Sequence, residues 1–101
     1  MDVYAYYDCS PSAPKDQPDL VVHWERKWRQ AGLKPRLITA RHARRSKFYA
    51  RRKDRPGALP LLAMHAVGGG LFAPFTEAKA VKITKTALTK FFNSRARKFC
   101  P

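Results

Sequence analysis

Apolar residues recur with two different periods in the first third of this chain, which predicts a strand followed by a helix. Residues 3–7 form a short β-branched and aromatic run, typical of a strand buried in a sheet. After a Ser- and Pro-rich breaker, Asp16 or Asp19 can cap a helix that reaches about Ala31, because apolar residues then follow at helical spacing. Gly32 stands just beyond, where glycine commonly ends a helix.

A second strand is predicted at residues 36–40, directly after Pro35. Strand, helix and strand within about 40 residues indicate a βαβ unit with parallel pairing, so the predicted fold class is α/β. Residues 41–53 follow as a very basic, helix-competent stretch with too few apolar residues to bury a full helix face. Residues 54–57, Asp-Arg-Pro-Gly, then predict a turn.

The second half of the chain predicts a buried helix, a short strand and a final helix. Residues 59–67 are apolar except for His65, and the glycines at 68–70 are expected to end this helix and let backbone pack closely. Because His65 has no acidic or cysteine partner at ligand spacing, it is interpreted as a hydrogen-bonded core residue rather than a catalytic one. Residues 81–84 alternate as in a half-buried strand, and Thr86 can cap the last helix. The inner stripe of that helix is predicted to be Leu88, Phe91, Phe92, Ala96 and Phe99.

Length and composition predict one small folded domain, residues 1–101, with a large positive charge. The chain has 21 Lys and Arg against 7 Asp and Glu, a formal net charge of +14. Apolar residues make up 45% of the chain, which is enough for a packed core. Self-repulsion of this size is tolerated best when an anionic partner screens it, so such a partner is expected.

The positive charge is concentrated in a basic segment, residues 41–55, and in a basic C-terminal helix, residues 86–99. The candidate contacts to an anionic partner are Arg41, Arg44, Arg45, Lys47, Arg51, Arg52, Lys53, Arg55, Arg95, Arg97 and Lys98. Phe48 and Tyr49 lie between these cations and are candidates for stacking on bases, with packing against the domain as the alternative. No helix-turn-helix, zinc-finger or RNP pattern is present, so sequence-specific recognition is not supported.

Cysteine usage and the absence of export signals favour a cytoplasmic location, or a particle assembled in the cytoplasm. Cys9 and Cys100 lie near opposite ends of the chain, without a CxxC spacing. Two free thiols are predicted, and a disulfide between them is the alternative. The start of the chain lacks the charged and apolar regions of a signal peptide, and no apolar run approaches the length of a membrane span.

Three pieces of the sequence, taken in order, resemble one protein family. They are the strand at residues 3–8, a helix carrying Trp24 and Trp28 that leads into a Gly-x-x-Pro turn at residues 32–35, and the helix ending in three glycines at residues 59–70. This order is similar to the N-terminal half of GT-A type glycosyltransferase-like proteins of bacteria and their viruses. The two tryptophans share a helix face, and we interpret them as core residues rather than a stacking platform. The resemblance implies a small Rossmann-like sheet with flanking helices, truncated before an acceptor-binding half.

The resemblance covers residues 3–75 and departs from the family where its chemistry would lie. The family's metal-binding Asp-x-Asp motif would fall near residues 73–75, which here are Ala, Pro and Phe and cannot ligate a hard divalent cation. Glu77 is the nearest carboxylate, and one carboxylate does not clamp a metal-diphosphate group. No catalytic residue, metal or cofactor is therefore predicted, and the family's chemistry is expected to be lost.

The sequence leaves two main hypotheses. The first is a non-catalytic binding or structural module whose basic segment engages an anionic partner: nucleic acid, or the acidic face of a large, multi-copy assembly such as a viral particle. The second is an active nucleotide-sugar transferase without a metal, in which the resemblance implies that Tyr6, Tyr7 and Asp8 meet the nucleotide. A third, plainer possibility is that the basic residues only form a solvated surface of an interaction protein. The sequence does not separate DNA, RNA and protein as partners.

Overall fold

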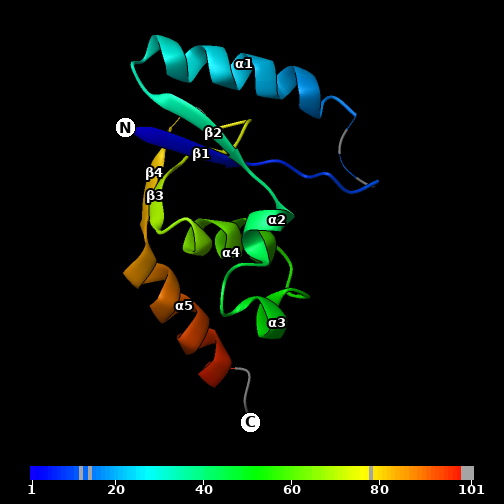
Figure 1. The fold of residues 1–101 in the computed structure, drawn as a ribbon, viewed down its shortest axis with the longest axis vertical. Coiled ribbons are helices and arrows are strands. Elements are labelled where there is room, and N and C mark those ends of the chain that lie inside the picture. Colours follow the sequence, from blue (N-terminus) through cyan, green and yellow to red (C-terminus); the bar gives the residue numbers. More distant parts are fainter. Residues whose placement is uncertain (12, 14, 78, 99–101) are drawn as a thin grey trace.

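A mixed four-stranded sheet organises the computed structural model, which describes residues 1–11, 13, 15–77 and 79–98, with side chains described up to residue 93. Within these residues the strand order is β2-β1-β3-β4 (Figure 1). The central pairings are parallel, between β1 and β2 and between β1 and β3, and β4 joins β3 antiparallel. The strands are β1 (Asp2–Tyr6), β2 (Lys34–Ile38), β3 (Gly69–Phe72) and β4 (Val81–Thr84). The predicted α/β class and the parallel βαβ unit are confirmed.

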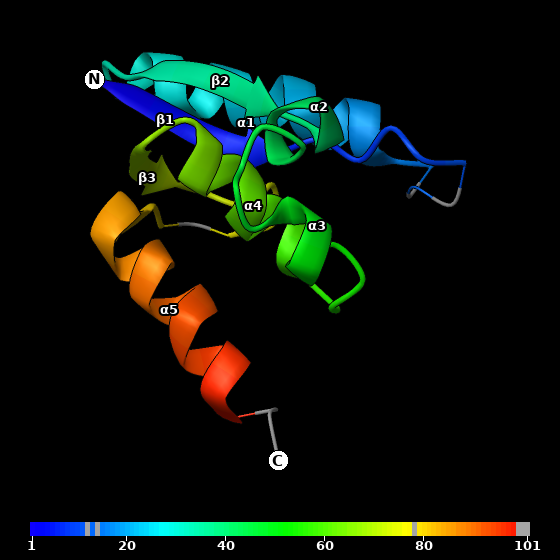
Figure 2. The same ribbon diagram turned by 60° about the horizontal axis from the view of Figure 1, so that its bottom comes forward.

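Helices lie on both sides of this sheet, in two unequal layers (Figures 1 and 2). Helix α1 (Gln17–Gln30) lies on one side. The other helices lie on the opposite side: α2 (Ala40–Ala43), α3 (Tyr49–Arg52), α4 (Ala58–Ala66) and α5 (Lys85–Lys98). No helix of the described residues is both long enough and apolar enough to cross a membrane.

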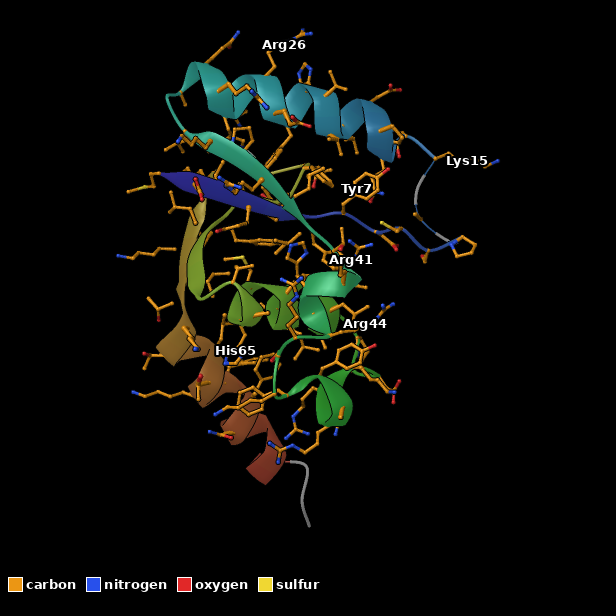
Figure 3. The ribbon with its side chains drawn as sticks, in the orientation of Figure 1. Tyr7, Lys15, Arg26, Arg41, Arg44 and His65 are labelled. Carbon is orange, nitrogen blue, oxygen red and sulfur yellow. The ribbon has the colours of Figure 1, made fainter. Side chains whose placement is uncertain are left out.

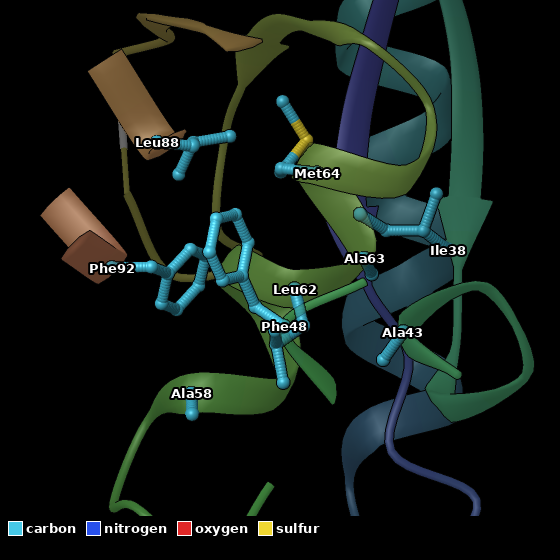
Figure 4. Packing of buried hydrophobic residues seen from close by; sticks show 9 residues of the cluster. All are labelled: Ile38, Ala43, Phe48, Ala58, Leu62, Ala63, Met64, Leu88 and Phe92. Carbon is cyan, nitrogen blue, oxygen red and sulfur yellow. The ribbon is translucent and has the colours of Figure 1, made fainter. Parts of the chain in front are cut away.

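The alternation of β1 divides the core into two clusters. Val3 and Ala5 are fully buried with Trp24 of α1, whose indole N–H donates to the Ala73 carbonyl at 2.7 Å. Trp28 packs against the same cluster, so the core interpretation of the tryptophans is confirmed. On the opposite face, Tyr4 and Tyr6 pack against the larger cluster. That cluster consists of Ile38, Ala43, Phe48, Ala58, Leu62, Ala63, Met64, Leu88 and Phe92 (Figure 4).

Strand β2 begins and ends two residues earlier than predicted. It runs over Lys34–Ile38, so Pro35 lies inside the strand, in register with Val3. Because β2 is an edge strand with only β1 beside it, a residue without an N–H is tolerated there. Thr39, predicted as strand, instead caps α2, and its hydroxyl accepts a hydrogen bond from the Arg41 N–H at 3.2 Å.

The basic stretch predicted as helix-competent is not one helix. It forms the short helices α2 and α3, separated by a turn at residues 44–48. Ser46 is buried in that turn, where its hydroxyl accepts from the Phe48 N–H at 3.2 Å and contacts His65. A serine that bonds the backbone locally competes with helix propagation, which explains the break. The turn predicted at residues 54–57 is present, with Gly57 at φ 71°.

The glycine run has the two predicted uses, and it also begins β3. Gly68 follows the end of α4 with φ 90°. Gly69 has φ 80°, and a Cβ placed there would lie 2.6 Å from both the Ile83 carbonyl oxygen and the Lys85 nitrogen. Glycine is therefore required where the β4–α5 junction crosses the start of β3.

Helix α5 differs in detail from the prediction. It begins at Lys85 rather than Thr86, and the Thr84 hydroxyl accepts from the Ala87 N–H at 3.1 Å. Leu88 and Phe92 are buried as predicted, whereas the side chain of Phe91 is 38% exposed. Phe99 and the side chain of Ala96 lie outside the described residues.

Candidate anion-binding surface

The cations of the basic segment stand on the surface of the domain. Arg41 and Arg44 extend from the region of α2, close to the carboxyl end of β2 (Figure 3). The exposed members of the segment are Arg41, Arg44, Arg45, Lys47, Arg51, Lys53 and Arg55. The side chains of Arg95, Arg97 and Lys98, which belong to the same prediction, lie outside the described residues.

Buried residues of the same segment anchor this surface to the core. Phe48 is 2% exposed, and its ring stacks on Phe92 with centroids 5.1 Å apart. Lys47 Nζ and Arg51 Cζ lie 5.4 and 5.7 Å from the Phe48 ring centroid, within range of cation–π attraction. The buried Phe48 ring therefore helps to position the two exposed cations Lys47 and Arg51.

Burial limits the access of a partner to Phe48 and Tyr49, the two candidates for stacking on bases. Phe48 lies in the core, so the prediction that it stacks on bases is wrong for this arrangement. Tyr49 is half-buried against the same core cluster, and Lys53 Nζ lies 5.8 Å from its ring centroid. Packing against the domain, the alternative left open by the sequence, accounts for both rings.

Arg52 also differs from its neighbours, because its guanidinium is turned inward. One terminal nitrogen donates to the Phe92 carbonyl of α5 at 3.3 Å, and its Nε is buried without a hydrogen-bond partner. Arg52 thus connects α3 to α5, and we assign it a structural role. It does not extend from the surface as the other cations do.

The exposed cations of the segment have little acidic compensation. Two ion pairs lie elsewhere in the domain: Arg29 with Glu25 at 3.3 Å in α1, and Arg36 with Asp2 at 2.9 Å between β2 and β1. Among the described residues, no carboxylate pairs with Arg41, Arg44, Arg45, Lys47, Arg51 or Lys53. This part of the surface therefore carries a concentrated positive field.

His65 lies beneath the basic segment and joins it to α4 and α5. Its ring is 5% exposed, its Nδ1 lies 2.9 Å from the Ser46 hydroxyl, and its Nε2 is buried without a partner. Burial lowers the pKa of His65 below its ordinary 6.5, and Lys85 and Lys47 lower it further. The interpretation of His65 as a hydrogen-bonded core residue is confirmed.

The depressed pKa of His65 predicts a loss of stability in mild acid. The unfolded chain takes up the histidine proton near pH 6.5, whereas the folded chain takes it up only at lower pH. The free energy of unfolding should therefore be fully retained above pH 6.5 and fall below it, by at most about 1.4 kcal/mol per pH unit. Urea unfolding of the wild type and of His65→Gln between pH 7.5 and 5 measures this, since glutamine can still contact Ser46 but does not titrate. Parallel curves for the two proteins would contradict the assignment.

A second group of predicted residues lies at the carboxyl end of β1. Tyr6 and Asp8 line a hollow of about 260 Å³ together with Lys53, Arg55 and Pro60, at the start of α4. Burial and then the nearby Asp8 carboxylate raise the pKa of Tyr6 above its usual 10.0, while Arg44 acts in the opposite direction. Tyr7 is half-buried outside the hollow, and its N–H donates to the Ile38 carbonyl at 2.7 Å. Tyr6 and Asp8, which the resemblance implies meet a nucleotide, therefore lie at the same edge of the sheet as cations of the basic segment.

Residues 73–75, where the Asp-x-Asp motif would fall, have structural contacts. Ala73 is fully buried and accepts the Trp24 hydrogen bond, and the Phe75 ring meets Trp24 edge-on with centroids 5.6 Å apart. Glu77 is exposed. Within the described residues, no three His, Cys, Asp or Glu side chains come together as metal ligands would.

Comparison with known proteins assigns no family: the chain matches no protein-family model, no curated protein and no solved structure at a significant level. What stands is a small α/β domain with a mixed four-stranded sheet, a basic surface and hollows at the carboxyl edge of the sheet.

One feature of this edge has no local signal in the sequence. A largely apolar hollow of about 390 Å³ is lined by Tyr6, Leu20, Pro60, Phe72 and Phe75, which are far apart in the chain. The signal that could have found it is topological: β1 and β3 are parallel neighbours, so their carboxyl ends open at the same edge of the sheet. Cys9 is exposed near this edge with a free thiol, and Cys100 lies outside the described residues.

Proposed function

We propose that this chain is a non-catalytic, strongly basic binding module that engages an anionic partner through residues 41–55. The observation that carries the proposal is the contrast between exposed cations and buried anchoring residues within this segment. Six of its exposed cations have no carboxylate ion-pair partner among the described residues (Arg41, Arg44, Arg45, Lys47, Arg51 and Lys53), while Ala43, Ser46 and Phe48 fix the segment to the core. A backbone that is already fixed to the core loses little conformational freedom on binding, which favours affinity.

Nucleic acid is the partner that this surface suits best. Arginine is the main cation exposed in the segment, and its planar guanidinium pairs with phosphate through two parallel hydrogen bonds. Acidic faces of a protein assembly, such as a viral particle, offer the same charge. The charge of +14 supports either partner and fast association.

We propose that the scaffold is a degenerate relative of the first half of a GT-A type glycosyltransferase, which the order of motifs in residues 3–75 resembles. The predominantly parallel sheet with helices on both faces is compatible with a small Rossmann-like unit. The apolar residues 73–75 offer no side-chain oxygen ligand where the family's Asp-x-Asp motif would fall, which favours a binding role over metal-assisted transfer chemistry.

Salt titration tests the proposal. A fluorescently labelled 12-nucleotide oligothymidylate is expected to bind with an affinity that falls about 50-fold between 50 and 200 mM salt if four phosphates are contacted. Fluorescence anisotropy at five salt concentrations gives the slope, and labelled polyglutamate of the same charge serves as the protein-like polyanion. Absence of binding, or binding that salt does not change, would exclude an electrostatic module.

A second candidate function is favoured by the hollow at the end of β1. Tyr6 and Asp8, implied by the resemblance to meet a nucleotide, line this hollow with Lys53 and Arg55, which could neutralise a diphosphate without a metal. An active nucleotide-sugar transferase predicts saturable binding of uridine diphosphate that Asp8→Ala abolishes. Under the binding-module proposal, Asp8→Ala leaves partner capture intact or strengthens it, because a carboxylate is removed from a phosphate-binding surface.

A further inference from the structure

The carboxyl edge of the sheet combines two adjoining hollows of different chemistry. The apolar hollow lies between the ends of β1 and β3, and the cationic hollow of about 260 Å³ lies beside it. Tyr6 and Pro60 line both, so the two hollows adjoin at these residues. A ligand that fits both must carry an apolar group next to an anionic one.

The apolar hollow suits a flat aromatic group. Three aromatic residues line it, Tyr6, Phe72 and Phe75, and the edge-on contact with Trp24 holds the Phe75 ring in place. Gln17 also lines it, but its side-chain amide is already bonded to the Asp8 backbone, at 2.8 and 3.3 Å. Few polar groups of this hollow remain to form hydrogen bonds with a ligand, so a ligand would be recognised there by stacking and burial.

Cations lie on both sides of the loop that follows β1. Lys53 and Arg55 line the hollow on one side, and Arg41 and Arg44 line a further hollow of about 430 Å³ next to Cys9. Asp8 is the carboxylate in the first of these, and its Oδ1 accepts from the Ser10 N–H at 2.8 Å. Anionic groups at more than one position along a partner can therefore be contacted at this edge.

We infer that the carboxyl edge binds single-stranded nucleic acid, with one unstacked base in the apolar hollow and the adjacent phosphates on the basic segment. This inference rests on the proposed function and names its partner. Only a strand with unpaired bases presents a flat apolar ring next to a run of phosphates. A duplex keeps its bases paired, and an acidic polypeptide carries its charge without such a ring.

Removing the base while keeping the phosphates tests the inference. The 12-nucleotide oligothymidylate is compared by fluorescence anisotropy with a strand of equal length in which all bases are replaced by tetrahydrofuran abasic units. The abasic strand is expected to bind about 10-fold more weakly with the same salt slope, in the range found for one stacked base.

A matched pair of substitutions on α1 locates the base. Leu20→Glu places a carboxylate in the apolar hollow, whereas Val22→Glu places the same charge on the same helix at a side chain that is 57% exposed and outside the hollow. Leu20→Glu should weaken oligothymidylate binding at least 10-fold relative to Val22→Glu, and should leave binding of the abasic strand equal to that of the control.

The possible failures separate the inference from the proposed function. If the abasic strand binds as tightly as its parent, with salt dependence intact, the base site is overturned and the basic module stands. If neither strand binds, the inference is overturned, and if polyglutamate also fails to bind, the proposed function is overturned with it. Tighter binding of a duplex, or displacement of the strand by equimolar uridine diphosphate, would overturn the single-strand assignment; the latter result would favour the transferase.

Discussion

Replacing Arg44, Arg45 and Lys47 by glutamate is expected to weaken oligothymidylate binding about 500-fold at 50 mM salt, if each side chain neutralises one phosphate. On a single strand each such contact contributes about 0.7 to the salt slope, so the slope should fall by about 2. All three side chains are exposed and none has a carboxylate partner among the described residues. Stability should therefore change by less than about 1 kcal/mol, which urea unfolding of the variant checks.

The control for this variant reverses the same number of charges at another place. Arg26, Lys34 and Lys82 are exposed and lie away from the carboxyl edge: Arg26 is on the outer side of α1 (Figure 3), and Lys34 and Lys82 lie near Asp2, at the opposite end of the sheet. Glutamate at these three positions lowers the net charge equally but should weaken binding only several-fold, because exposed charges farther away than the Debye length, about 14 Å at 50 mM salt, are largely screened. Equal losses in the two variants would show that total charge, rather than the basic segment, attracts the partner. The basic residues would then form only a solvated surface.

Phe48→Ala is expected to lower the free energy of unfolding by about 3–5 kcal/mol. The ring lies between Phe92 of α5 and His65 of α4, with centroids 5.1 Å from each, and removing it leaves a cavity where three elements meet. A domain of this size has roughly 5–15 kcal/mol of stability in total, so the variant should be marginal. Urea unfolding followed by tryptophan fluorescence measures the change, since Trp24 is buried.

Phe91→Ala provides the matched control for the core substitution. It is the same exchange, one residue before Phe92 in α5, at a side chain that is 38% exposed. We expect a smaller loss of about 1–2 kcal/mol, because more than a third of this side chain is already exposed to solvent and its removal leaves no enclosed cavity. If both variants lost the same stability, Phe48 would not be the anchor of the basic segment. Phe48→Leu, which retains much of the volume, should restore most of the loss.

The sequence predicted well the elements whose apolar pattern matches their surroundings. Residues 3–7 correspond to β1, and residues 59–67 to α4, which is buried on most of its surface. The predicted α1 ends one residue from the observed end, since Gly32 has the positive φ of 85° that stops a helix there. In these segments the local conformational preference and the tertiary packing favour the same structure, so the hydrophobic pattern alone was sufficient to predict it.

The sequence did not predict the basic segment correctly, because tertiary contacts decide its conformation. Helix propensity favours a continuous helix at residues 41–53, yet Ser46 and Phe48 are drawn into the core by His65 and Phe92. The same contacts turn Phe48 away from solvent and Arg52 toward the Phe92 carbonyl. Neither partner can be identified from the segment itself, since both lie at least 17 residues from Ser46 and Phe48.

By itself, the sequence determined that this chain is a small, strongly basic α/β domain with a concentrated cationic segment, because composition and periodicity are local properties. Only the tertiary structure decided where those cations stand. The parallel pairing of β1 with β3 brings Tyr6 and Phe72 to one edge, and the packing of α3 and α4 brings Lys53 and Arg55 to the same place. Residues about 50 to 70 positions apart meet there because chain topology and burial, which depend on the whole domain, set their distance.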